Sequence, residues 1–218
     1  AMELYRRNKS AMFNAERTFY GISIKEGVFP LYAGTFMVEC VKGNGSLSDI
    51  EYAKISADRP RTLAMSTVIM SDKVLKMPLF EEGNAHVKDM YNYYKDLQSH
   101  GIPIVKMDCR DNMIAMPLIR SERLGEHLQV LAKTDKCAFY ECLDKLYDCI
   151  CTSSEHVPVE ASPLCSKRPE ADWGPVLRRA YLELIDLNCF YDGEYLFFDQ
   201  EYMRENYPAK YIMYRELI

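Results

Sequence analysis

Short apolar runs separated by polar turns dominate the chain just after its first fifty residues. Three segments rich in β-forming residues follow one another, at 50–55, 63–70 and 73–78. Only Ser71 and Asp72 separate the last two, and a two-residue link between strand-like runs indicates an antiparallel hairpin. The pattern therefore predicts a small antiparallel sheet in this part of the chain.

After these segments, the apolar positions no longer alternate but recur every three to four residues. Residues 84–99 place one apolar stripe at helical spacing, which consists of Val87, Met90, Tyr91, Tyr94 and Leu97. Further along, the pattern predicts a strand over 112–118, helices over 123–131 and 137–151, a loop over 152–175, a short helix around 175–181 and a last helix from near Pro208. Strands followed mainly by helices indicate an α+β fold.

The first 49 residues have a weaker pattern. A polar, partly helical start over 3–19 is followed by a strand-like run over 36–41, which a turn over 42–46 ends. We therefore expect an N-terminal extension over 1–49, a strand-rich part over 50–118 and a mainly helical part over 119–218. The whole suits one structural domain, either alone or cut from a longer protein.

Composition narrows the functional classes. The formal net charge of −5 and the short basic groupings argue against a nucleic-acid partner. No run approaches the roughly 18 apolar residues of a membrane span, and the N-terminus lacks the apolar stretch of a secretory signal. The eight cysteines form no CxxC pair, which favours free thiols in a reducing compartment. We expect a cytoplasmic protein with no membrane span.

The stretch 184–201 carries the candidate chemistry. Asp192-Gly193 is typical of a two-residue type I′ turn, which would set Asn188 opposite Phe197. Because side chains alternate along a strand, Asn188 and Asp199 would then lie on one face as diagonal neighbours, about 7 Å apart at Cα. Asp186 would lie directly opposite Asp199.

An amide oxygen beside carboxylates suits a hard cation such as Mg²⁺, which keeps several waters and takes few protein ligands. The alternative is that these polar residues merely end an edge hairpin in solvent. The apolar neighbours Cys189, Phe190, Leu196, Phe197 and Phe198 favour a buried hairpin, where acidic groups need a partner.

The order of these elements resembles the protein-kinase-like fold, especially its branch that phosphorylates small molecules and sugars. Val74-Leu75-Lys76 looks like the strand that carries the family's lysine, and 84–99 looks like the helix after it. Met116-Pro117-Leu118-Ile119 is similar to the hinge. The stretch from Phe197 to Tyr214 also resembles kinase-like domains of bacterial surface-polysaccharide enzymes, which can be joined to methyltransferase or glycosyltransferase domains.

The resemblance implies roles for particular residues. Lys76 would hold nucleotide phosphates and pair with an acid, for which Asp89 is our choice and Glu81 and Glu82 are alternatives. Asn188 and Asp199 would bind the metal. The family's catalytic Asp lies five residues before the Asn, where this chain has Glu183, whereas Asp186 lies only two residues before it. Glu183 and Asp186 both remain candidates for the residue that positions the acceptor hydroxyl.

The resemblance implies a phosphotransferase that uses ATP and Mg²⁺ on a hydroxyl of a carbohydrate or glycan precursor. The strand-rich part would be the N-lobe and the helical part the C-lobe. One departure is that no glycine occurs in 56–61, where many kinases have a glycine-rich loop. The rival hypothesis is therefore a non-catalytic nucleotide-binding or interaction module, within a larger methyltransferase or glycosyltransferase.

Overall fold

The computed structural model describes residues 16–28, 39–168 and 170–216. Two compact units make up the chain, Ala1–Ser48 and Asp49–Ile218. In the first unit, helix α2 (Glu16–Lys25) is followed by a loop in which the Glu39 carboxylate accepts hydrogen bonds from the Ser48 amide and hydroxyl at 2.8 and 2.6 Å. The predicted helix at 3–19 lies mostly outside the described residues, and α2 continues beyond its predicted end. Of the predicted strand at 36–41, only 39–41 is described, and it is not a strand.

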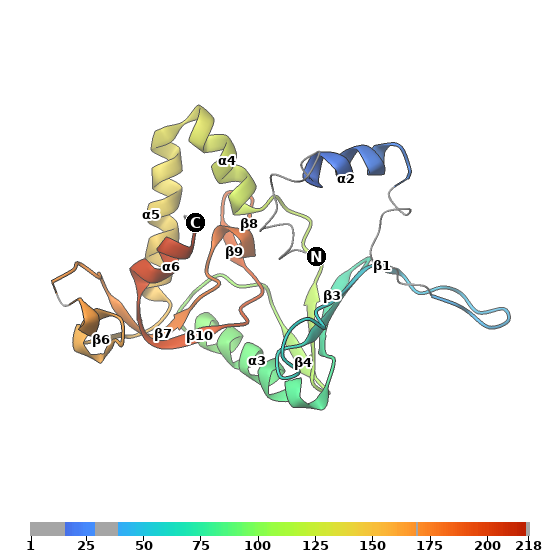
Figure 1. The fold of residues 1–218 in the computed structure, drawn as a ribbon, viewed down its shortest axis with the longest axis horizontal. Helices are drawn as coiled ribbons and strands as arrows, with labels where there is room; N and C mark the ends of the chain where they lie inside the picture. The colour runs from blue at the N-terminus through green and yellow to red at the C-terminus, as the bar shows by residue number, and fades with distance from the viewer. Residues whose placement is uncertain (1–15, 29–38, 169, 217–218) are drawn as a thin grey trace. The chain divides into compact units, whose positions relative to one another are not determined.

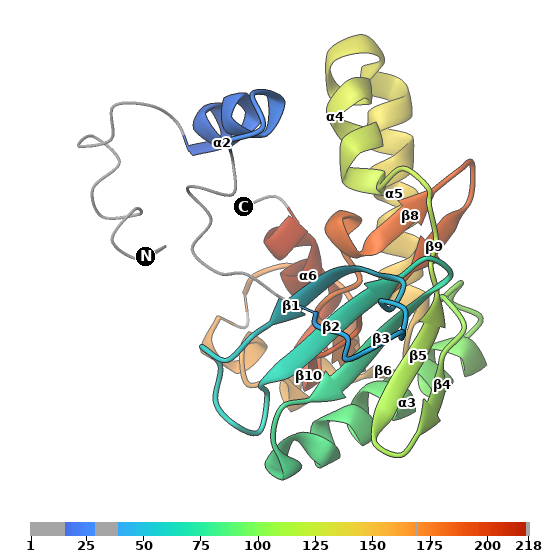
Figure 2. The same cartoon turned by 90° about the vertical axis from the view of Figure 1, so that its right-hand side faces the viewer.

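A five-stranded antiparallel sheet forms the N-lobe of the second unit (Figures 1 and 2). In spatial order its strands are β1 (Ile50–Ile55), β2 (Met65–Met70), β3 (Lys73–Pro78), β5 (Met113–Pro117) and β4 (Asp108–Arg110). The hairpin expected at Ser71 and Asp72 is confirmed, and Thr67 faces Lys76 across β2 and β3. Strand β4 has three residues, too few to give a recognisable alternation.

Helix α3 (Asn84–Ser99) packs against one face of this sheet, over the span that the sequence predicts. Its buried residues Val87, Met90 and Tyr94 belong to the same apolar cluster as Met65 and Ile114 of the sheet. The helix thereby closes the core of the N-lobe, and Figure 2 shows it running beneath the strands.

The C-lobe is built around a helix pair and a second, smaller sheet. Helices α4 (Leu124–Thr134) and α5 (Lys136–Thr152) meet at Asp135, whose carboxylate caps α5 by accepting from the amides of Cys137 and Ala138. Strands β6 (His156–Val157), β7 (Val176–Tyr181) and β10 (Met203–Pro208) form an antiparallel sheet, and α6 (Ala209–Glu216) follows. A continuous core joins these elements through Leu146, Leu177, Tyr181 and Ile212.

The prediction of a helix around 175–181 is wrong, because this segment forms strand β7. Val176, Leu177, Ala180 and Tyr181 are buried in two adjacent pairs, a spacing that also fits a helix. Pairing with β10, from Val176 opposite Pro208 to Tyr181 opposite Met203, makes the segment a strand. The deciding partner lies more than twenty residues away and is invisible to local periodicity.

The predicted register of the C-terminal hairpin is also wrong. Strands β8 (Cys189–Tyr191) and β9 (Tyr195–Phe197) pair Tyr191 with Tyr195, so the connecting loop has three residues rather than two. Within that loop only Gly193 has a positive φ, of 101°. Cys189 therefore faces Phe197, and the diagonal placement of Asn188 and Asp199 on one sheet face does not occur.

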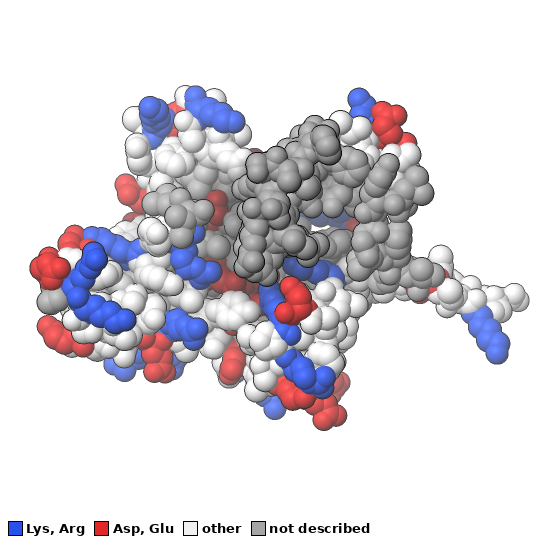
Figure 3. Space-filling model, viewed as in Figure 1, with Lys and Arg blue, Asp and Glu red and all other residues white. Residues whose placement is uncertain are grey.

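The second unit is thus an α+β fold with a small antiparallel N-lobe and a reduced, mainly helical C-lobe, as the sequence predicts. Within the described ranges, no helix has the length and apolar character needed to cross a bilayer. On the face drawn in Figure 3, basic and acidic side chains are interspersed over the surface.

Candidate functional site

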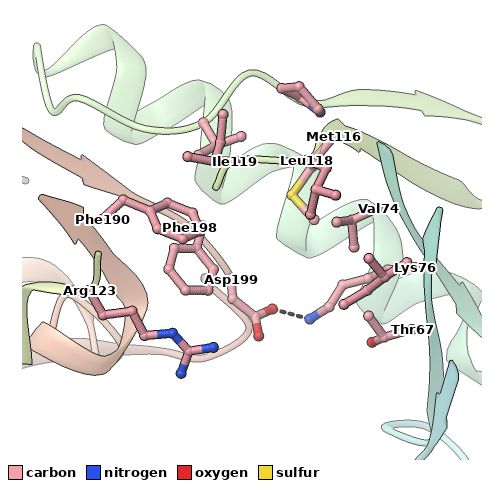
Figure 4. Close-up of a pocket in the computed structure, with 13 residues that line it drawn as sticks. Thr67, Val74, Lys76, Met116, Leu118, Ile119, Arg123, Phe190, Phe198 and Asp199 are labelled. Atoms are coloured by element: carbon pink, nitrogen blue, oxygen red, sulfur yellow. Dashed lines mark hydrogen bonds and ion pairs between the residues drawn. The ribbon is translucent and has the colours of Figure 1, made fainter. Parts of the chain in front are cut away.

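A cavity of about 280 Å³ lies between the N-lobe sheet and the C-terminal hairpin. Strands β2 and β3 supply Thr67, Ile69, Val74 and Lys76 to its walls, and the segment after β5 supplies Leu118 and Ile119 (Figure 4). Val105, Met116, Pro117, Arg123, Phe190, Phe198 and Asp199 complete the lining. The cavity is mostly apolar, and Lys76 and Asp199 form a charged end. A mostly apolar pocket with a few polar groups is typical of a small-molecule site.

Two stacked aromatic rings form the C-lobe side of the cavity. The ring centroids of Phe190 and Phe198 are 4.4 Å apart with an interplanar angle of 23°. Phe190 comes from β8 and Phe198 directly follows β9, so the hairpin positions both rings. Val74 and Met116 contribute apolar surface from the N-lobe side (Figure 4).

Lys76 is the centre of the charged end. It lies on β3, is 5% exposed, and forms ion pairs with Asp199 and, at 2.7 Å, with Glu201. Burial lowers the pKa of Lys76, but the negative charges of Asp199 and Glu201 outweigh this effect and raise the pKa above its ordinary value. The ammonium group therefore stays charged, and Lys76 lines the cavity between the lobes.

The prediction that Asp89 pairs with Lys76 is wrong. Asp89 lies on α3 but is exposed, and the ion pairs of Lys76 are with Asp199 and Glu201. Glu82 binds Arg61 at 2.8 Å. On the same helix His86 is buried, and burial lowers the pKa of its imidazole. The acids that hold Lys76 come instead from the segment after β9. Periodicity places an acid on a helix face, but cannot say which carboxylate the fold brings to a buried lysine.

Glu201 joins two cations with one carboxylate. Its Oε1 accepts from Lys76 at 2.7 Å and its Oε2 from Arg59 at 2.6 Å, with only 7% of the side chain exposed. Burial raises the pKa of Glu201, but the charges and hydrogen bonds of Lys76 and Arg59 bring the pKa below its ordinary value. Sequence reasoning missed Glu201, although the spacing Asp199-x-Glu201 beside apolar residues was a signal that could have found it.

Glu183 belongs to the same charged cluster. Its carboxylate accepts from the Glu201 amide at 2.8 Å, and the Gln200 side chain donates to its backbone carbonyl. Burial raises the pKa of Glu183 to about 7, and the negative charges of Glu201 and Asp199 act in the same direction. A carboxyl group with a pKa near neutrality is suited to general base chemistry.

Asp186 and Asn188 lie directly before strand β8, in a short 3-10 turn (Asp186–Asn188). The Asp186 carboxylate lies over the first turn of α4, where a Cβ added to Gly125 would be 2.5 Å from its Oδ2. The prediction that Asp186 lies directly opposite Asp199 is wrong, because the hairpin pairs Cys189 with Phe197. The Asn188 carbonyl accepts from the Phe198 amide at 2.9 Å, so the backbone brings Asn188 next to the residue before Asp199.

Asp199 follows β9 with a φ of 61°, in the left-handed region that side chains other than glycine seldom adopt. Such a conformation persists where surrounding contacts enforce it, and it is common at functional sites. Here the Asp199 carboxylate lies beside the Lys76 ammonium, as the dashed line in Figure 4 shows.

A divalent cation fits the donor set only with help from a ligand. Asp199 offers a carboxylate on a side chain that is 32% exposed, and Asn188, whose backbone bonds with that of Phe198, carries an amide oxygen. Within the described residues, no group of three or more His, Cys, Asp and Glu side chains could hold a metal ion. Mg²⁺ commonly takes one or two carboxylates and completes its shell with substrate phosphates, so this set suits a metal that arrives with a nucleotide.

The comparisons with known proteins add little to this geometry. No protein-family model matches the sequence, and no curated protein matches it. Among solved structures, the ternary complex of streptomycin, ATP and APH(2")-IIa is similar over 90% of this chain and 74% of that chain, with a TM-score of 0.46 and 12% sequence identity. The site therefore stands on its own geometry.

Proposed function

We propose that the protein is an ATP- and Mg²⁺-dependent phosphotransferase that acts on a hydroxyl group. The observation that carries the proposal is the buried Lys76, paired with Asp199 at the charged end of a mostly apolar cavity. The apolar part, with the Phe190 and Phe198 rings, suits the base of a nucleotide, and the charged end suits its phosphates.

Each charged residue then has a part in the transfer. Lys76 donates to phosphate oxygens of the nucleotide, and Asn188 with Asp199 would hold Mg²⁺, which neutralises charge on the transferred group. The acceptor oxygen attacks the γ-phosphorus, the bond from that phosphorus to the bridging oxygen of ADP breaks, and the acceptor proton moves to a carboxylate. We assign this proton to Glu183, whose pKa is raised to about 7.

Asp186 is the weaker candidate for this base. Its carboxylate lies over α4 at Gly125, whereas Glu183 interacts electrostatically with Lys76, Asp199 and Glu201. We propose Asp186 as a residue that holds the turn before β8 against α4.

The acceptor that we propose is a carbohydrate or glycan precursor, as in the bacterial surface-polysaccharide enzymes that the C-terminal stretch resembles. The reaction would take place in the cytoplasm, where ATP is supplied, and other domains of the same polypeptide could supply or use the product.

The test compares the wild type with Asp199→Asn for ATP consumption, in the presence of Mg²⁺ and a panel of sugars, polyols and glycan fragments. The amide keeps the shape of Asp199 but removes the charge that would hold the metal, so turnover should fall at least about a hundredfold. Wild-type turnover that survives this substitution undiminished would refute the site.

The rival is a nucleotide-binding module without turnover. It is favoured by the lack of glycine between Ser56 and Arg61 and by a glutamate where the family has its catalytic aspartate. A wild type that binds ATP with Mg²⁺ but consumes none with any acceptor in the panel would favour the module.

A further inference from the structure

We infer that Arg59 binds the phosphate chain of the nucleotide and replaces the glycine-rich loop, with Glu201 holding Arg59 and Lys76 ready as a pair of cations. This inference rests on the proposed function, because it assigns a phosphate-binding residue to the same site. Arg59 lies in the connection between β1 and β2, whereas Glu201 lies in the segment after β9, 142 residues later in the sequence.

The first support is the geometry of the shared carboxylate. Glu201 accepts from Lys76 through one oxygen and from Arg59 through the other, at 2.7 and 2.6 Å. Because one carboxylate accepts from both cations, the ammonium and the guanidinium lie on either side of the same group. An ammonium and a guanidinium brought together in this way make a site for an extended anion.

The second support is the difference in exposure between the two cations. The side chain of Lys76 is 6% exposed and is held by Asp199 as well as Glu201, whereas the side chain of Arg59 is 34% exposed. Arg59 can therefore move from Glu201 to a phosphate without leaving a buried carboxylate unpaired, because Glu201 still accepts from Lys76. Lys76 is fixed, and Arg59 is the cation that can exchange partners.

The third support is the composition of the connection itself. A glycine-rich loop approaches phosphates with backbone amides, which is favoured where no Cβ intervenes. The connection here contains no glycine, and Pro60 has no amide hydrogen to donate. A long arginine side chain can reach phosphates from a loop that stays further away.

Arg61 provides a contrast within the same connection. Its guanidinium binds the exposed Glu82 at 2.8 Å and lies over the Phe80 ring, 3.7 Å from the centroid. Its partners belong to the outer end of the N-lobe, and it has no contact with Glu201 or Lys76. Arg61 is therefore a matched control: an arginine two positions away with an ion pair of its own.

The experiment measures binding of adenosine, ADP and ATP to the full chain by calorimetry, with and without Mg²⁺, for the wild type, Arg59→Gln, Arg59→Lys and Arg61→Gln. We expect Arg59→Gln to weaken ATP binding about tenfold or more, since a charge-assisted hydrogen bond is lost, and to change adenosine binding less than twofold. Arg59→Lys should restore part of the loss, and Arg61→Gln should bind all three ligands as the wild type does. The dependence of ATP affinity on salt should become less steep in Arg59→Gln.

Other results would overturn the inference in distinguishable ways. If the wild type binds ATP and Arg59→Gln binds it equally well, the inference fails and the proposed function stands. If Arg59→Gln weakens adenosine and ATP by the same factor, Arg59 only supports the structure, and the inference fails. If the wild type binds none of the three ligands, the proposed function fails and the inference fails with it. Urea unfolding of each variant shows whether it is folded.

Discussion

At the scale of single residues, the site is a balance of charges around one buried lysine. Lys76 and Arg59 supply two positive charges, and Asp199 and Glu201 supply two negative ones. Glu183 is a third carboxyl group within electrostatic reach, and its pKa is raised to about 7. The cluster is therefore neutral while Glu183 is protonated, and the ionisation of Glu183 adds a negative charge where burial already disfavours it.

This arrangement predicts how stability depends on pH. The unfolded chain loses the Glu183 proton near the ordinary value of 4.5, whereas the folded protein keeps this proton to about 7. Between these values the folded state binds more protons than the unfolded state, so stability falls as pH rises through this window. The variant Glu183→Gln has no carboxyl group at this position, so its stability does not fall for this reason as pH rises. Its free energy of unfolding, relative to the wild type, should rise by on the order of 2 kcal/mol between pH 5 and pH 8.

Urea unfolding at the two pH values measures this difference. The control is Glu160→Gln, which removes an exposed carboxylate and should change stability by less than about 0.5 kcal/mol at either pH. An effect of Glu183→Gln that is equal at pH 5 and pH 8 would show that the Glu183 carboxyl group is not perturbed by folding.

At the scale of elements, the β8–β9 hairpin positions most of the C-lobe side of the site. Asn188 directly precedes it, Asp199 and Glu201 follow it, and Phe190 lies within it. Its three-residue loop has a positive φ only at Gly193, whereas a two-residue type I′ turn needs a positive φ at both central residues. The geometry of one turn therefore decides the register of residues at both ends.

The loop geometry predicts unequal effects of two substitutions. Gly193 has a φ of 101°, so Gly193→Ala should destabilise the protein by roughly 1–2 kcal/mol, because an L side chain is strained there. Asp192 does not have a positive φ and is exposed, so Asp192→Ala should cost less than about 0.5 kcal/mol. Thermal or urea unfolding measures both. Equal costs at the two positions would instead indicate a two-residue type I′ turn.

At the scale of the whole molecule, the core and the candidate site are contained in one unit. Among the described residues, the buried apolar clusters of both lobes and the lining of the cavity lie within Asp49–Ile218. The lobes are connected by the sheet-to-helix segment after β5 and by the ion pairs of Lys76 and Arg59 with the hairpin segment. The N-lobe core and the C-lobe core thus meet at the cavity.

A truncated chain tests this containment. Residues 49–218 expressed alone should unfold in one cooperative transition and retain the ATP affinity of the full chain within about threefold, because the described residues of both apolar clusters and of the cavity wall are all kept. Calorimetric titration and thermal unfolding of both chains measure this. Loss of ATP binding in a truncated chain that still unfolds cooperatively would show that residues 1–48 take part in the site.

The sequence alone determined the elements whose pattern is local. Strands at 50–55 and 73–78 and the helix at 84–99 follow from alternation and helical spacing over a few residues, and the two-residue link at Ser71 and Asp72 made a hairpin. Lys76 could be placed in the cleft because the family resemblance joined its strand to the helix after it. These properties need no knowledge of distant residues.

Only the tertiary structure decided what depends on a distant partner. The pattern of 176–181 fits a helix or a strand, and pairing with β10 selected the strand. Several acidic residues lie near Lys76 in the sequence, and Asp89 is one of them. The buried ammonium pairs instead with Asp199 and Glu201, which the fold brings next to it. The physical reason is the same in both cases: backbone pairing and charge neutralisation in the interior are satisfied by neighbours in space, and periodicity along the chain carries no information about them.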